Sequence, residues 1–453
     1  MVYGPVTEKQ NLTEGFFLTD LIAGDEIIIQ LLEPANSKET SNLSISRVVH
    51  AYKNMFPFDP MSSQRAATLT CYYDVACYSA WMSESDAVAL VLLSDGTSWC
   101  TGSLLNNTAQ NFRPFFLTAF HCIDTERLPN GCSDGVLSNT EISNAENWMF
   151  RFQYKKTTCS GNITSTVIDY NQANFRAAWR DTDFALMELR TNINNERITF
   201  LGWDRNDVIS STGTNIHHPA GEPMKISFDI HSLNRNSSIS WDDCTTSAIN
   251  THWSVHYDTG AFERGSSGSP LFNTDKLVIG QLHGGSIQCP PTTGYFGQLR
   301  LSWTGGITNA TRLSNWLYSL GLGPAATTTN TVRFPPIVGP DVVASTCLAT
   351  YSISGLPSSG VANQVWTITG GLRYLNGYGT NSCNVERNPL NNLEFATVQF
   401  TCTIHGQPFS TERTVTARII PKIATGIYDS ATNQAVPLQK LENRTIFNPI
   451  YGL

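Results

Sequence analysis

Short apolar segments separated by clusters of Asn, Gly, Ser and Pro recur from residue 71 to residue 322. Examples lie at residues 87–93, 115–119 and 277–282. Runs of this length, bounded by turn-forming residues, are typical of antiparallel strands. A chain that alternated strands with helices would need longer segments of helical period between them. We therefore expect an all-β fold for this part of the chain rather than an α/β fold.

The segment at residues 265–270 reads Gly-Ser-Ser-Gly-Ser-Pro and stands before the apolar strand predicted at 277–282. Small residues on both sides of Ser267 allow the backbone to turn sharply. Such a turn exposes the hydroxyl and leaves backbone amides free to stabilise an oxyanion. A simple hairpin turn has a similar composition, so this segment alone does not distinguish the two.

Two upstream segments favour a catalytic role for Ser267. An apolar strand at 115–120 leads directly to His121, and Asp183 stands before another apolar strand at 184–189. A serine hydroxyl needs a base to become a nucleophile, and the base needs an acid to orient it. The order His, Asp, Ser is that of the chymotrypsin-type triad. We predict Ser267 as nucleophile, His121 as base and Asp183 as its partner, with Asp181 as the alternative acid.

The sequence resembles the trypsin-like serine proteases and, within them, the bacterial lysyl endopeptidase family. The resemblance covers roughly residues 66 to 322 and rests on several motifs, which lie at residues 100–107, 116–122, 183–184, 202–205, 217–219, 265–270, 280–285 and 302–306. It implies a double six-stranded β-barrel. It also implies a secreted serine endopeptidase, acting on protein or peptide substrates through an acyl-enzyme, with no cofactor and no metal.

The resemblance also implies roles for residues around the triad. The backbone amides of Gly265 and Ser267 would form the oxyanion hole. Trp241 and His283 match an aromatic pair that flanks the catalytic histidine in the family, although either could be an ordinary core residue. Ser266 stands where many relatives of trypsin carry an aspartate that pairs with a newly formed N-terminus, so that trigger is absent.

His217 and His218 are rival candidates for the catalytic base. They precede a proline in a predicted loop and match a structural motif of the family. We therefore interpret them as structural.

Eleven cysteines occur without a close CxxC pair and without a Cys/His spacing suited to zinc. This usage predicts disulfides formed in an oxidising compartment. The resemblance implies the pairs Cys71–Cys289, Cys77–Cys159 and Cys100–Cys122. Cys132 and Cys244 are additional to the family pattern and could pair with each other. The pairing of the remaining cysteines, Cys347, Cys383 and Cys402, stays open.

The residues expected to line the primary specificity pocket are Ala261, Phe262, His283, Gly284 and Gly294. A pocket for lysine must supply an anionic partner. The position of trypsin's pocket aspartate is Ala261, that of the lysyl endopeptidases is Gly294, and no Asp or Glu occurs from residue 286 to 303. Glu263 and Asp258 are the nearest carboxylates. We therefore expect a preference for an uncharged side chain.

The chain divides into four predicted parts, which are a β-rich pro-region or its remnant at 1–65, a protease domain at 66–322, a linker at 323–340, and an immunoglobulin-like domain with a tail at 341–453. Alternating apolar residues at 26–32 and 43–49 predict strands in the first part, which could also be an independent binding module. Processing is expected at Arg65–Ala66. The order Cys347, Trp366, Cys402 is typical of an immunoglobulin-like sandwich. The spacing of apolar residues in the segment at 311–318 predicts a helix.

Composition excludes some classes of partner. A net charge of −8 argues against nucleic acid, and no apolar run approaches the roughly 20 residues of a membrane helix. The first residues lack the pattern of a signal peptide, so we expect a piece of a longer secreted precursor, located outside the cell. Two other functions remain open. The chain could be an inactive protease homologue that serves as a binding module, or an adhesin acting through its C-terminal part.

Overall fold

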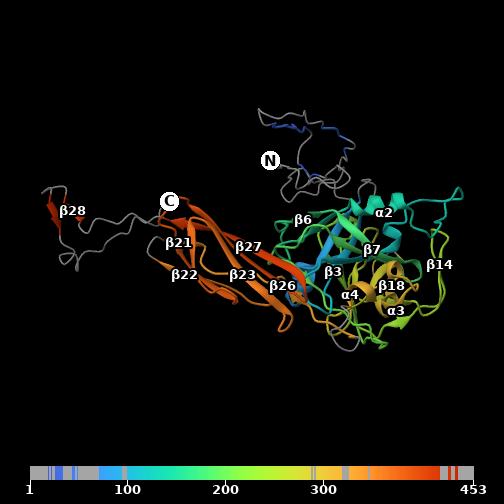
Figure 1. Ribbon diagram of the computed structural model, residues 1–453. Helices are drawn as coiled ribbons and strands as arrows, with labels where there is room; N and C mark the ends of the chain where they lie inside the picture. Colours follow the sequence, from blue (N-terminus) through green and yellow to red (C-terminus); the bar gives the residue numbers. More distant parts are fainter. Residues whose placement is uncertain are drawn as a thin grey trace. The chain divides into compact units, whose positions relative to one another are not determined.

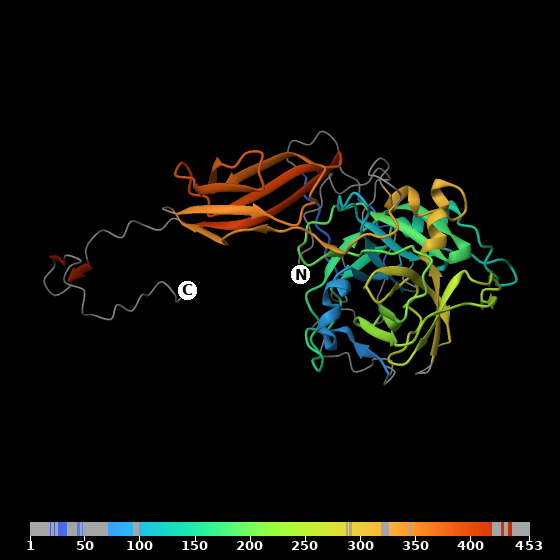
Figure 2. The ribbon, with the colours of Figure 1, turned by 90° about the horizontal axis from the view of Figure 1, so that it is seen from below.

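The computed structural model of the chain (Figures 1 and 2) divides into two compact units, Met1–Phe334 and Pro335–Leu453. The structure describes residues 71–93, 99–286, 289, 292–318, 326–344 and 347–418, a few positions between 19 and 48, and the backbone of 427–429 and 434–436. Residues 26–33, 43–45 and 48 are exposed and in no strand, contrary to the strands predicted at 26–32 and 43–49. A strand requires a paired neighbour, which an alternating pattern alone cannot supply. Most of the predicted pro-region, including Arg65–Ala66, lies outside the described residues.

The first unit is built on two antiparallel sheets. The eight-stranded sheet has, in spatial order, β1 (Tyr73–Asp74), β11 (Lys225–Asp229), β10 (Gly213–His217), β16 (Pro270–Phe272), β17 (Val278–Gly285), β18 (Thr292–Gln298), β15 (His252–Tyr257) and β12 (Asn234–Arg235). The seven-stranded sheet has β6 (Ile168–Asn171), β5 (Met149–Phe152), β2 (Val88–Leu92), β3 (Trp99–Leu105), β4 (Phe115–Ala119), β8 (Phe184–Leu189) and β7 (Ala173–Trp179).

The all-β prediction is confirmed, but the sheets have eight and seven strands instead of six each. In the larger sheet the two outermost strands, β1 and β12, are only two residues long. Each makes a short pairing with the edge of the sheet, at Tyr73–Ile226 and at Asn234–Ser254. Without these additions six strands remain, so the larger sheet exceeds the prediction only at its margins.

The two sheets share one apolar core. Strand β4 is buried at all five positions because its sequence, Phe-Phe-Leu-Thr-Ala, carries no charge. Phe115 and Leu117 of β4 pack in the same cluster as Ile216 and Phe272 from the other sheet. Each such side chain stabilises the fold by roughly 1.5–3 kcal/mol when fully buried. The core therefore holds the ends of strands from both sheets in fixed positions.

Helices are few and short. Helix α2 (Asn139–Glu146) starts with a capping box from Ser138 and lies beside β7 (Figure 1). Helix α3 is Leu299–Thr304. The helix predicted at 311–318 is present only as a 3-10 turn at Asn309–Thr311 and as α4 (Ser314–Leu317). Tyr318, which caps α4, has an extended backbone and ends that helix.

Four disulfides join distant parts of the first unit: Cys71–Cys289, Cys77–Cys159, Cys100–Cys122 and Cys132–Cys244. The first three are the pairs that the family resemblance implies. The fourth is the additional pair considered for this chain. Such crosslinks typically stabilise a fold by roughly 2–4 kcal/mol each.

The second unit contains two four-stranded sheets. One has, in order, β20 (Ile337–Val338), β22 (Leu348–Ile353), β25 (Ser382–Arg387) and β24 (Leu372–Asn376); the other has β21 (Val342–Ala344), β27 (Gln407–Arg418), β26 (Phe395–Ile404) and β23 (Val361–Gly370). Trp366 and Cys402 lie on paired strands of one sheet, and Cys347, Cys383 and Cys402 are free thiols. The inter-sheet disulfide of antibody domains is therefore not formed. The immunoglobulin-like assignment stays a prediction.

Candidate active site

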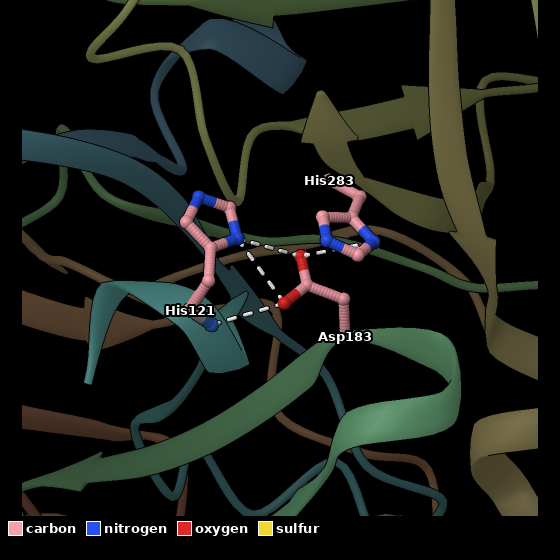
Figure 3. Close-up of side chains that lie close together, drawn as sticks. All are labelled: His121, Asp183 and His283. Carbon is pink, nitrogen blue, oxygen red and sulfur yellow. Dashed lines mark hydrogen bonds and ion pairs between the residues drawn. The ribbon is translucent and has the colours of Figure 1, made fainter. Parts of the chain in front are cut away.

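His121 and Asp183 come together because β4 and β8 pair side by side. Antiparallel pairing of Ala119 with Phe184 places the residues just beyond these two positions next to each other. The His121 backbone N–H donates to Asp183 Oδ1 at 2.9 Å. The His121 ring lies with Nδ1 at 2.9 Å from Oδ2 and 3.1 Å from Oδ1 of the same carboxylate (Figure 3). Three contacts to one carboxylate fix both the position and the plane of the imidazole.

Asp183, and not Asp181, is the partner of His121. Asp183 is 1% exposed, whereas Asp181 is exposed to solvent. The backbone at Asp183 has φ 56°, at the end of the short 3-10 turn Arg180–Thr182. This left-handed conformation, which Asp tolerates better than most residues, turns the chain from the 3-10 turn into β8. It also directs the carboxylate at His121.

The environment of His121 favours its protonated form. Burial lowers the pKa of this histidine, but the adjacent charge of Asp183 and the hydrogen bond to it have the opposite effect, and the pKa ends above its ordinary value. The His121 side chain is still 28% exposed. The second ring nitrogen, Nε2, lies on the side away from Asp183 (Figure 3). A base oriented in this way can accept a proton at Nε2 while Asp183 stabilises the resulting imidazolium.

Ser267 is half-buried in a turn that joins the two sheets. Its carbonyl accepts from the Thr101 N–H at 2.8 Å, and the next residue, Gly268, donates to the Leu282 carbonyl at 2.7 Å. Gly268 has φ 83°, and a Cβ there would lie 2.3 Å from Thr118 Oγ1. Only glycine fits this close approach. The turn therefore lies against strand β4, which leads to His121.

The amides of Gly265 and Ser267 donate to no residue within the described part of the chain. Gly265 has φ 98°, while the intervening Ser266 N–H turns back to the Glu263 carbonyl at 2.9 Å. Two unengaged N–H groups in one turn provide the donors that an oxyanion needs. The Ser267 hydroxyl likewise makes no hydrogen bond to His121 in this structure.

Ser266 connects the turn to the buried histidine His217. The Ser266 Oγ lies 2.7 Å from His217 Nδ1, and His217 Nε2 lies 3.2 Å from Ser227 Oγ. Because the Ser227 hydroxyl donates to the Ala261 carbonyl, it accepts from His217 Nε2–H. His217 Nδ1 must then accept from the Ser266 hydroxyl. This hydrogen-bonded chain holds the turn at the position where many relatives of trypsin carry an aspartate.

His217 and His218 do not contact the triad residues, in keeping with their structural interpretation. Burial lowers the pKa of His217 to about 3 and that of His218 to about 4. Both side chains are fully buried. His218 is engaged through Nδ1 with the Glu222 carbonyl at 2.9 Å. Two neutral, hydrogen-bonded imidazoles of this kind brace the loop.

His283 lies between the rings of His121 and Trp241. Its ring stacks on Trp241 with centroids 3.7 Å apart and on His121 with centroids 5.4 Å apart. His283 Nδ1 lies 3.8 Å from Asp183 Oδ2 (Figure 3) and 3.0 Å from His252 Nε2. Burial and the neighbouring histidines lower the pKa of His283 well below its ordinary value. The site therefore contains a neutral imidazole beside His121.

A hydrogen-bonded chain sets the tautomer of His283. The Thr251 hydroxyl donates to the Ala248 carbonyl, so it accepts from His252 Nδ1–H. His252 Nε2 then accepts from His283 Nδ1–H. His252 could not be predicted as part of the site, because it lies 31 positions before His283 and no local pattern marks the contact.

Trp241 is held by its own loop. Its indole N–H donates to Ser247 Oγ at 2.8 Å, and its carbonyl accepts from the Cys244 N–H. The Cys132–Cys244 disulfide ties this loop to the segment that follows His121. The additional disulfide thus supports the aromatic stack over His283.

The pocket residues lie close to the turn but carry no carboxylate. Ala261 is fully buried and Phe262 is 2% exposed. Of the two nearby acids, Glu263 accepts from the Tyr72 hydroxyl at 2.6 Å. Asp258 accepts from the Ile230 N–H and pairs with the exposed His231. Both carboxylates therefore have other partners.

Two groups of side chains in the described residues could supply three metal ligands each, namely His121, Asp183 and His283, and Asp229, His231 and Asp258. In the first group a metal would have to displace the proton shared by His121 and Asp183. In the second, both oxygens of Asp229 already accept backbone N–H groups, from His231 and His256. We assign a metal to neither.

Comparison with known proteins identifies the family of this chain. A fold of two antiparallel sheets with His, Asp and Ser presented in this order defines the trypsin-like serine protease class. Residues 66–297 match the family model described as lysyl endopeptidase, C-terminal domain. The chain therefore belongs to the lysyl endopeptidase family, which confirms the resemblance seen in the sequence.

One curated relative is the lysyl endopeptidase of Pseudomonas aeruginosa, which is 26% identical over 298 residues, covering 61% of this chain and 58% of the relative. The chain thus spans little more than half the length of that protein. Similar solved structures include a Glu endopeptidase (15% identity, TM-score 0.31, 50% of this chain and 91% of the other) and Deg5 (12% identity, TM-score 0.33, 48% and 86%). No helix in the described residues has the length and apolar character needed to cross a membrane.

Proposed function

We propose that the chain is a secreted serine endopeptidase in which Ser267, His121 and Asp183 form the catalytic triad. The observation that carries this proposal is the pairing of His121 with the buried Asp183, beside a serine turn with two unengaged amides. Membership of the lysyl endopeptidase family supports it. The four disulfides support secretion, because such crosslinks persist in oxidising compartments. We also propose that the enzyme is made as a precursor.

The reaction would proceed in two steps. His121 Nε2 takes the proton from the Ser267 hydroxyl as Oγ attacks the carbonyl carbon of the substrate. The oxygen of that carbonyl becomes an oxyanion and accepts from the amides of Gly265 and Ser267. As the C–N bond breaks, His121 returns the proton to the leaving amine and an acyl-enzyme remains.

Water then hydrolyses the acyl-enzyme by the same route, with His121 again taking a proton and returning it to Ser267. Asp183 keeps the imidazole in one tautomer and stabilises its charged form throughout. No step requires a cofactor.

Labelling with a fluorophosphonate probe tests this proposal, since the probe reacts with activated serines. We expect the purified chain to be labelled at Ser267 and to cleave a peptide library. Ser267→Ala should abolish labelling and reduce cleavage by several orders of magnitude, with little change in the thermal transition. Ser238→Ala, at an exposed serine, is the matched control and should behave as wild type. Absence of labelling in the wild-type chain would instead favour an inactive homologue that acts as a binding module.

A further inference from the structure

We infer that the Phe262 ring fills the primary specificity pocket, so that the enzyme cleaves after small uncharged residues such as Gly, Ala and Ser. This inference rests on the proposed function and names its substrate class. It differs from the lysine preference expressed in the family name.

The end of β17 marks where the substrate side chain must enter. Because the Gly268 N–H donates to the Leu282 carbonyl, the residues that follow Leu282 run beside Ser267. Gly285 at the end of β17 pairs with Gly294 on β18. When the carbonyl of the bond to be cleaved faces Ser267, the side chain of the substrate residue that carries this carbonyl points toward these two glycines.

Two glycines would ordinarily leave an open slot, but Phe262 occupies it. A Cβ placed on Gly285 would lie 3.0 Å from Phe262 Cζ, and one placed on Gly294 would lie 3.3 Å from Phe262 Cε1. The ring is 2% exposed and so touches both glycine walls with almost no solvent around it. A Cβ on Gly285 would also lie 2.1 Å from the Thr293 carbonyl, so that position requires glycine for the backbone as well. With the ring against both glycines, little room remains for a long substrate side chain.

The Phe262 ring has no space into which it could retreat. A Cβ on Gly294 would also lie 3.4 Å from Tyr257 Cε2 and 3.2 Å from Phe296 Cε2, and the Tyr257 and Phe262 ring centroids are 6.2 Å apart, so these rings pack around the same site. Tyr257 and Phe296 are 1% and 0% exposed and belong to the same apolar cluster as Phe262. Protein interiors are packed as densely as organic crystals. The depth of the pocket is therefore limited by Phe262.

Among the residues that the structure describes, the carboxylates near this pocket already have other partners. Glu263 is bound to Tyr72, and Asp258 accepts from the Ile230 N–H at the surface. Asp229 is buried but already accepts two backbone N–H groups. A lysine entering the pocket would bury an unpaired ammonium. The cost corresponds to a kcat/KM for lysine about a thousandfold or more below that for a small uncharged residue.

The test is a series of internally quenched peptides that differ only in the residue before the cleaved bond. For the full chain we expect kcat/KM to be highest for Gly, Ala or Ser, about a hundredfold lower for Phe or Leu, and about a thousandfold lower for Lys. Phe262→Ala should raise kcat/KM for Leu and Phe at least tenfold while changing the value for Ala by less than about threefold. Phe395→Ala, at an exposed phenylalanine of the second unit, is the matched control and should keep the wild-type profile.

Labelling by the fluorophosphonate probe gives the fraction of active enzyme in each preparation. Where Phe262→Ala does not fold, Phe262→Leu makes a smaller opening and should raise the value for Leu at least threefold. A labelled wild-type enzyme that prefers Lys or Arg, or a Phe262 variant that folds with an unchanged profile, would overturn this inference and leave the proposed function intact. A wild-type chain that is not labelled would overturn the proposed function and this inference together.

Discussion

The cluster around His121 and the pocket around Phe262 are neighbouring buried regions made of opposite kinds of residue. The first joins His121, Asp183, His283 and His252 by hydrogen bonds and ring contacts. The second joins Phe262 to other apolar side chains in one cluster. The β17 strand serves both regions, since it carries His283 to the first and Gly285 to the second.

Under the proposed function, the region around His121 determines the reaction rate and the region around Phe262 determines the choice of substrate. Buried polar groups remain stable only when their donors and acceptors have partners, and in the first region each partner also sets a tautomer. The cluster around Phe262 contains no charged side chain and is held together by apolar contact. This contrast predicts that substitutions in the first region change rates and pH dependence, whereas substitutions in the pocket change substrate choice and stability.

The largest expected effect comes from the acid of the cluster. Asp183→Asn should lower kcat/KM by about 10⁴-fold, because the amide would favour the wrong tautomer of His121 and would not stabilise its charge. Asp183 raises the pKa of His121, so in the variant the acid limb of the kcat/KM profile against pH should move to lower pH. Measuring kcat/KM against pH for one peptide tests both points. Asp181→Asn, at the exposed alternative acid, should stay within about twofold of wild type.

An acid placed in the pocket should have the next largest effect. Ala261→Asp puts a carboxylate at a fully buried position without a cation, and we expect it to lower the free energy of unfolding by roughly 3 kcal/mol or more. Burial raises the pKa of such a carboxyl, so the loss should shrink at acidic pH. Urea unfolding measures the change, with Ala310→Asp at an exposed position as the control. Equal stability of the two variants would mean that water reaches Ala261.

The smallest expected effect distinguishes the two regions by titration. Burial lowers the pKa of His252 to about 4, whereas an unfolded histidine titrates near 6.5. The unfolded state takes up the proton first, so His252 should cost roughly 1–2 kcal/mol of stability as the pH falls from 6.5 to 5. Unfolding of His252→Gln across this range should show a correspondingly weaker pH dependence. Phe262→Leu should instead lower the free energy of unfolding by an amount that does not change with pH, because neither side chain titrates.

Much of the fold class and of the candidate site could be predicted because the signals are local. Short apolar runs between turn residues indicate strands, and strand β4 followed by His121 follows that pattern. The roles proposed for Ser267, His121 and Asp183 were predicted from residue type and chain order. The preference for Asp183 over Asp181 agrees with the burial of the former and the exposure of the latter. The strand predicted at 26–32 was wrong, because alternation describes a strand only if a neighbour pairs with it.

Only the tertiary structure determined the contacts between residues that lie far apart in the chain. Tyr72 binds Glu263 across 191 positions and so removes a carboxylate that the sequence leaves available to the pocket. The stack of Trp241 on His283, its support by the Cys132–Cys244 disulfide, and the placing of Phe262 between Gly285 and Gly294 are equally invisible in local pattern. Sequence by itself determined which chemical groups are present and which strands can form. The distances between the side chains of the candidate site depend on how the two sheets pack over a common core. Packing brings together side chains that are distant in the sequence, so no local sequence pattern predicts these contacts.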